Sequence, residues 1–320
     1  MNIRTLCCVG AALAASLAGA NAWAADGPPV AKSLTVAALA FDRFNTEAGA
    51  LDGEFANGGE VAAAVKLGAA YDVKQFEKGM IAYAAFAAMR EPSFAAGVRR
   101  AAAAAGSEDE FARQLLADPR LALGIEGAEK AQVRLRAALG KETQGVRVAG
   151  MAVKQAAYDV QHQAWSKAAI PNRAARLAQA KALSKPMVLV DDRHLDRVMV
   201  GLSEPAPRSY RGAETPMVDK ALTLAALAVL GHAGDADEGE IAPLLSDENT
   251  GWCVKMAKLN YFQCLSVAGP HYEDIYCLGK HAIGDTAQCV VEAASLGTLD
   301  VEAPRRKESG LVATAERTKR

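Results

Sequence analysis

Residues 252–294 read WCVKMAKLNYFQCLSVAGPHYEDIYCLGKHAIGDTAQCVVEAA and contain four of the six cysteines of the chain. Two helix-forming stretches flank Gly269-Pro270. This pair stops one helix and starts the next, because glycine suits the position after a helix and proline suits its first turn. The segment therefore predicts a helical hairpin whose arms, residues 252–267 and 270–294, each hold two cysteines.

The spacing of the cysteines predicts how they pair. Cys253 and Cys264 lie within about 20° of one face of an ideal helix, because each residue turns it by about 100°. Cys277 and Cys289 are about 120° apart on an ideal helix, unless Gly284 permits a local bend. An antiparallel hairpin favours Cys264 with Cys277 and Cys253 with Cys289, although four cysteines allow three pairings.

The hairpin can be compared with two other cysteine arrangements. Its layout is similar to that of the twin-Cx9C helical hairpins of intermembrane-space proteins, but the spacings here are Cx10C and Cx11C. That likeness covers only the hairpin and implies no activity. A four-cysteine zinc site is disfavoured, because structural zinc ligands usually come as close C-x2–4-C pairs, which this segment lacks.

The remaining two cysteines lie in a segment with the features of a signal peptide, residues 1–24. It combines Arg4, an apolar stretch too short to span a bilayer, and Ala22-Trp23-Ala24, a small-x-small cleavage site. We expect a mature chain that begins at Ala25 in the periplasm or outside the cell. Disulfides persist in those compartments and are rare in the cytosol, so the leader and the cysteines support each other.

Composition favours an all-α fold. Of 320 residues, 51% are hydrophobic but only 6% are aromatic, so Ala, Leu and Val must form most of the core, and alanine favours helices over strands. We expect a multi-helix array over residues 25–185, a linker or surface loop over 186–214, a smaller helical module over 215–300 that ends in the hairpin, and a disordered tail over 301–320.

Three local predictions concern helix ends and the proposed linker. Gly140 and Gly145 should separate two helices, residues 126–139 and 146–169. Ser93 should cap the helix that follows Glu91-Pro92. Within the proposed linker, residues 187–190 fit a short strand and residues 191–200 fit a short helix about equally well.

The charge balance and the motifs limit the function. Lys and Arg number 36 against 37 Asp and Glu, so the chain has no basic excess for nucleic acid, and no later stretch is long enough to span a membrane. It also lacks a P-loop or a nucleophile elbow. We therefore favour a non-enzymatic binding or scaffold protein of the cell envelope, without a cofactor and with an envelope protein as partner. Its aromatic side chains would be partly core and partly contact surface: Trp252, Tyr261, Phe262, Tyr272 and Tyr276.

The alternative hypothesis is a metal-dependent hydrolase or a metal-binding protein. His271, Glu273, His281 and Asp285 form the densest group of side chains able to bind a divalent ion or transfer protons. A structural role competes with this, because acidic residues in a first helical turn offset the positive helix end. The other histidines are isolated, and we expect hydrogen-bonded or surface positions for them: His162, His194 and His232.

Overall fold

The computed structural model describes residues 30–188, 192–203 and 212–297, and the proposed signal peptide and C-terminal tail lie outside these ranges. The described residues are mostly helical and form no strand, only an isolated bridge between Ala169 and Pro270. The all-α prediction is therefore confirmed. The first half contains α2 (Lys32–Gly49), α3 (Gly58–Ala69), α4 (Val73–Ala88), α5 (Pro92–Ala105), α6 (Glu108–Ala117), η1 (Pro119–Gly124) and α7 (Ala128–Val160).

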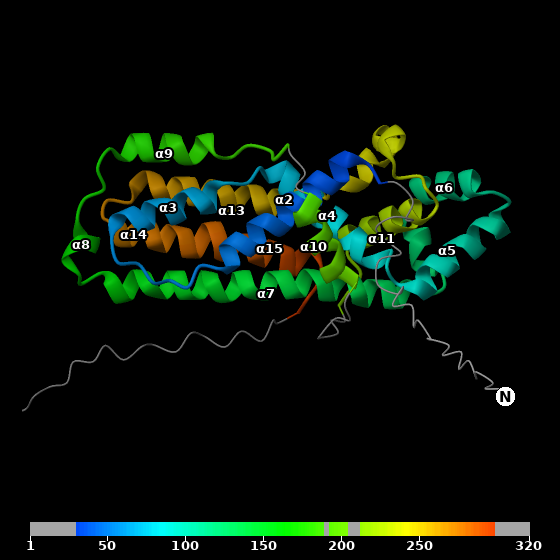
Figure 1. Ribbon diagram of the computed structural model, residues 1–320, viewed down its shortest axis with the longest axis horizontal. Helices are drawn as coiled ribbons and strands as arrows, with labels where there is room; N and C mark the ends of the chain where they lie inside the picture. Colours follow the sequence, from blue (N-terminus) through cyan, green and yellow to red (C-terminus); the bar gives the residue numbers. More distant parts are fainter. Residues whose placement is uncertain (1–29, 189–191, 204–211, 298–320) are drawn as a thin grey trace, which may run out of the picture.

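The second half continues with short connections and ends in the hairpin. It contains α8 (Ala164–Lys167), α9 (Arg173–Ala182), α10 (Asp192–Ser203), α11 (Pro216–Val229), η2 (Asp235–Asp237), α12 (Glu238–Ile241), η3 (Ala242–Leu245), α13 (Glu248–Val267), α14 (His271–Cys277), η4 (Leu278–Asp285) and α15 (Thr286–Ala293). Figure 1 shows an elongated molecule in which α7 runs along most of its length and the hairpin lies beside it.

Helix α4 lies at the centre of the fold. Every residue from Gly79 to Met89 is buried, because α2, α7 and α11 pack around this helix. Aromatic side chains of α2 and α4 contact each other there, with ring centroids of Phe41 and Phe76 5.1 Å apart. Buried side chains from residues 25–185 and from residues 215–300 belong to one continuous core.

Helix α7 is one helix of 33 residues, so the prediction of a break at Gly140 and Gly145 was wrong. A glycine costs a helix about 1 kcal/mol relative to alanine, whereas burying one Leu or Val side chain gains about 1.5–3 kcal/mol. Leu135, Leu139 and Val146 are fully buried on this helix, so packing outweighs the glycine cost.

One other local expectation, the cap of α5, differs from the structure, whereas the helical alternative for residues 191–200 of the proposed linker is confirmed. Helix α5 is capped by the side chain of Glu91, not Ser93, with Pro92 in its first turn. Part of the proposed linker forms helix α10, which packs on α2 and α4 through the buried Val198 and Leu202. Residues 187–188 form no strand.

Two disulfides join the arms of the hairpin. Cys264 is bonded to Cys277 near the turn, and Cys253 is bonded to Cys289 further along, with Cα–Cα distances of 5.6 and 5.7 Å. These are the pairs that an antiparallel hairpin favours. In the described residues no helix is long and apolar enough to cross a membrane.

A π-helical segment explains how both disulfides form. Residues Leu278–Asp285, η4, have π-helical hydrogen bonding. A π-helix has roughly 4.4 residues per turn, so each residue turns it by about 82°. Eight π-helical steps and four α-helical steps bring Cys289 to within about 25° of Cys277 around the axis, instead of about 120°. Both cysteines of this arm therefore face α13.

Glycines bring this arm close to α7. A Cβ added to Gly279 would lie 2.4 Å from the backbone nitrogen of Lys154, and one added to Gly150 would lie 3.1 Å from that of Gly284. No side chain fits between the two backbones at these points. The hairpin is therefore fixed against α7. The turn between its two arms lies opposite the C-terminal end of that helix.

Candidate functional site

Helix α14 begins between two cavities. Tyr272, Glu273 and Tyr276 line one of them, whereas His271 and Asp274 line the other. This division follows from helical spacing, because residues three or four positions apart share a face. The first turn of α14 is thus the part of the hairpin that meets open space on two sides.

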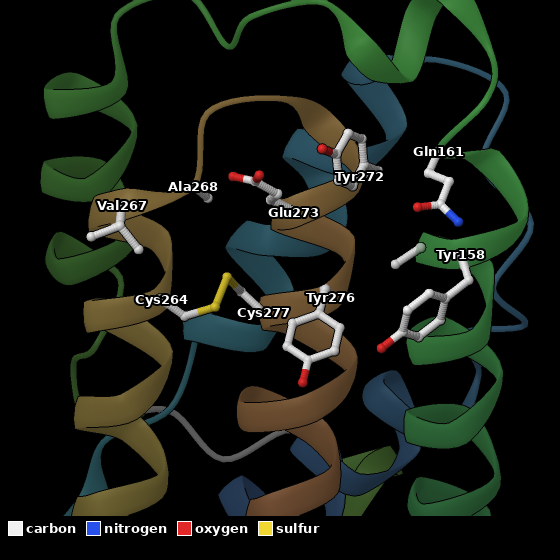
Figure 2. A pocket seen from close by; sticks show the side chains of 10 residues that line it. Tyr158, Gln161, Cys264, Val267, Ala268, Tyr272, Glu273, Tyr276 and Cys277 are labelled. Atoms are coloured by element: carbon white, nitrogen blue, oxygen red, sulfur yellow. A yellow bond between two sulfur atoms is a disulfide. The ribbon is translucent and has the colours of Figure 1, made fainter.

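The first cavity is a groove of about 450 Å³ between α7, α13 and α14. Figure 2 shows Tyr158 and Gln161 projecting from α7 toward α14, with the Cys264–Cys277 disulfide between α13 and α14. We call this space the tyrosine groove. Its volume lies in the range of small-molecule sites, which are typically concave, mostly apolar and supplied with few polar groups.

Aromatic rings shape the tyrosine groove. The rings of Tyr158 and Tyr276 meet edge to face, with centroids 6.2 Å apart and an interplanar angle of 86°. Tyr158 is 48% exposed and Val267 is 74% exposed. Removing exposed apolar surface of this kind from water is favourable, so the groove favours an apolar or aromatic ligand.

Glu273 is the one carboxylate of the groove, and no lysine or arginine is among its described lining residues. The Glu273 carboxylate accepts a hydrogen bond of 2.7 Å from the backbone N–H of Gly269. This bond closes the turn between the two arms and fixes the carboxylate at the edge of the groove. The one charged side chain among the described lining residues is therefore negative and lies beside electron-rich tyrosine faces, which favours a cationic ligand group.

The second cavity contains a buried ion pair. Arg176 of α9 donates hydrogen bonds of 2.5 Å to both carboxylate oxygens of Asp274 and a further one to the carbonyl of Leu265. Asp274 is 2% exposed, and burial raises its pKa to about 6 although Arg176 opposes the shift. This ion pair holds α9, α13 and α14 together, so its role is to position the start of α14.

The four residues of the metal hypothesis separate into different contacts. The Nδ1 atom of His281 lies 2.8 Å from one carboxylate oxygen of Asp285, and the other oxygen accepts a hydrogen bond of 2.5 Å from Lys280. Glu273 is engaged at the turn, and the ring centroid of His271 lies 6.5 Å from that of Trp165. Within the described ranges, no group of three or more His, Cys, Asp or Glu side chains is placed to hold a metal ion.

The other histidines occupy separate positions. His194 contacts Asp42 at 2.7 Å, and His232 contacts the exposed Asp109 at 3.2 Å, while His162 is exposed. The hairpin aromatics divide between core and surface. Tyr261 is fully buried and Trp252 is 61% exposed, whereas the intermediate positions belong to Phe262, Tyr272 and Tyr276.

Sequence reasoning missed a buried lysine. Lys258 is 4% exposed, and its Nζ donates hydrogen bonds of 2.7 Å to the carbonyls of Ala69 and Tyr71. It also lies 3.5 Å from the centre of the Tyr71 ring. Burial lowers the pKa of Lys258 to about 7. Lys258 lines none of the described cavities, and its hydrogen bonds hold the end of α3 and the residues that follow it.

Comparison with family models, curated proteins and solved structures found no match. The interpretation of the tyrosine groove therefore depends on the residues of this chain alone.

Proposed function

We propose that the protein is an exported helical binding protein of the periplasm or the extracellular medium, and that the tyrosine groove is its ligand site. Two observations support export: the signal-peptide pattern of residues 1–24 and two disulfides, which persist in oxidising compartments. The ligand class that best fits the groove is a small aromatic or apolar molecule with a positively charged amine.

The combination of rings and charge in the groove is the observation that carries this proposal. Tyr158, Tyr272 and Tyr276 line it together with the carboxylate of Glu273, and its described lining residues include no basic side chain. The face of a tyrosine ring attracts a cation, and this contact is worth about 1 kcal/mol, or roughly fivefold in affinity. Because α7 and the cross-linked hairpin hold these rings in place, the ligand orders few side chains when it binds.

Calorimetric titration with three matched molecules tests the ligand class. Phenethylamine, phenethyl alcohol and hydrocinnamate each place a phenyl ring on a short chain and differ in charge. We expect the amine to bind most tightly, by about fivefold over the alcohol, and the carboxylate to bind most weakly. Equal binding of all three, or binding of none, would contradict the proposal.

Two groove variants and one control separate the contributions. Tyr276→Ala should weaken all binding, because it removes a ring from the groove. Glu273→Gln keeps an oxygen acceptor for the Gly269 N–H, so it should remove the preference for the amine and leave the alcohol unchanged. Trp252→Ala removes an exposed ring outside the groove and should change nothing. Loss of binding in that control would show that the site lies elsewhere.

Intact-mass measurement tests export independently of the ligand. The mature protein should begin at Ala25 and incorporate no alkylating reagent before reduction, because all four remaining cysteines are bonded. Alkylation of two or more cysteines without reduction would overturn the oxidising-compartment assignment.

A further inference from the structure

A third cavity lies far from the hairpin turn, between the first turns of α2 and of α4. It has a volume of about 550 Å³, and none of its lining residues belongs to the tyrosine groove. Lys32 and Ser33 come from α2, and Lys74 and Lys78 come from α4. We call it the lysine cavity.

The lysines of this cavity are arranged on neighbouring walls. Lys74 and Lys78 are four residues apart on α4 and so share one face, an arrangement of like charges that destabilises a helix. Lys78 is half-buried and its Nζ donates a hydrogen bond of 2.9 Å to the hydroxyl of Ser33. Lys32 is exposed at the start of α2.

The described side chains around the lysine cavity carry more positive than negative charge. Within the described part of the chain, no ion pair includes Lys32, Lys74 or Lys78. Glu238 is the one carboxylate among the lining residues. Asp235 lies nearby and accepts a hydrogen bond of 2.7 Å from the backbone N–H of Lys32. Three lysines therefore face one lining carboxylate. The repulsion among the lysine charges is relieved when an anion binds.

The rest of the cavity is apolar. Val36 and Ala37 contribute one side, and Met187 and Val188 contribute the other. The side-chain amide of Gln75 fixes this second side, because it donates to the carbonyl of Met187 at 2.7 Å and accepts from its N–H at 2.6 Å. Val188 is nonetheless 74% exposed, so an apolar surface that no side chain of the described residues covers lies beside the lysines.

We infer that the lysine cavity binds an amphipathic anion, with a phosphate or carboxylate head on the lysines and a short apolar chain along Val36, Met187 and Val188. The charge selects the head, and the apolar wall selects the chain. This ligand class differs in sign of charge from the one proposed for the tyrosine groove, so the two sites are tested independently.

Calorimetric titration with octyl phosphate, kept below its micelle concentration, tests the inference. We expect saturable binding that weakens as salt is raised, because salt screens the lysine charges. Inorganic phosphate and octyltrimethylammonium should each bind at least about tenfold more weakly, since each lacks one half of the ligand. Equal binding of inorganic phosphate or of the cation would overturn the inference.

Variants show whether the cavity itself is responsible. Lys74→Met with Lys78→Met should weaken octyl phosphate at least about tenfold. The matched control, Lys130→Met with Lys167→Met, changes the net charge equally at exposed positions outside the described cavities. Equal weakening in the control would overturn the inference. Lys74→Met alone provides a second test, because Lys74 is exposed and its removal leaves the Lys78–Ser33 bond intact.

Vesicles distinguish a free ligand from a membrane lipid. Phosphatidylcholine vesicles with and without one-fifth phosphatidylglycerol are mixed with the protein and sedimented. Binding of soluble octyl phosphate supports the proposed site in the lysine cavity, whether or not the protein also sediments with the vesicles. Sedimentation with anionic vesicles in the absence of octyl phosphate binding would overturn it, because the contact would then be with a membrane surface.

Discussion

Removal of each disulfide separately should destabilise the protein by different amounts. The bonds join cysteines 13 and 36 residues apart. Alone, the inner bond closes a loop worth about 3 kcal/mol of unfolded-state entropy, and the outer bond one worth about 3.8 kcal/mol. The bonds are nested, however, so the outer bond closes an effective loop of about 25 residues once the inner one exists, worth about 3.5 kcal/mol.

The nesting predicts an order of effects. Cys253→Ala with Cys289→Ala should cost about 3.5 kcal/mol, and Cys264→Ala with Cys277→Ala about 2.6 kcal/mol, because the outer loop grows again when the inner bond is lost. Reduction of both bonds should cost about 6 kcal/mol, a large part of the stability of a typical protein. Alanine avoids a buried hydroxyl at Cys277 and Cys289, which are 0% and 1% exposed.

Urea unfolding followed by far-ultraviolet circular dichroism measures these differences. The oxidised wild type is the reference, and the wild type in reductant shows the effect of opening both bonds without deleting a side chain. Loss of the inner bond should also weaken ligand binding in the tyrosine groove, which that disulfide lines, whereas loss of the outer bond should not. If the inner pair costs more than the outer pair, or if both cost less than about 1 kcal/mol, loop entropy does not dominate.

Two further predictions concern buried charges. Lys258 has a pKa lowered to about 7, so the unfolded chain binds more protons above that pH, and wild-type stability should rise by about 2 kcal/mol from pH 7 to pH 9. Denaturant unfolding of Lys258→Met at both pH values should lack this rise, and an unchanged rise would contradict the assignment. Arg176→Met leaves Asp274 buried without its cation, which should cost about 3 kcal/mol at pH 7.5. The cost should be much smaller at pH 5, where Asp274, with a pKa already near 6, is protonated. The control Arg173→Met removes an exposed contact to the carbonyls of Ser266 and Val267. It should cost less than about 1 kcal/mol at either pH, and an equal loss in both variants would contradict the role of the ion pair.

Helix starts that depend on local chemistry can be recognised from the sequence. Ser107 caps α6 and Thr215 caps α11, as their positions before helix-forming stretches indicate. The continuity of α7 was not predictable in this way. It depends on how α2, α4 and the hairpin pack against that helix, which no window of the sequence contains.

The candidate sites also combine features that local sequence indicates with features that depend on long-range packing. Lys258 lies in the apolar stripe of Val254, Tyr261 and Leu265, so helical spacing alone indicates its burial. Tyr158 and Tyr276 are more than a hundred residues apart in sequence. They meet only because α14 packs against α7. Lys32 and Lys74 are likewise separated in sequence and joined by the packing of α2 on α4.

The π-helical segment links features of the hairpin that appear separate in the sequence. The unequal cysteine spacings require the second arm to turn less per residue than an α-helix does, and η4 supplies this. The same geometry brings both Lys280 and His281 onto Asp285, because residues four and five positions apart then share a face. Gly279 provides the close approach of this segment to α7. Hydrogen bonding of the π type is uncommon over eight residues, so bonds at Cys277 and Cys289 on either side of η4 stabilise a conformation that the segment alone would not keep. The His281–Asp285 contact is therefore part of what stabilises the π-helical segment. The part of the hairpin that is available to a ligand is the tyrosine groove beside α14.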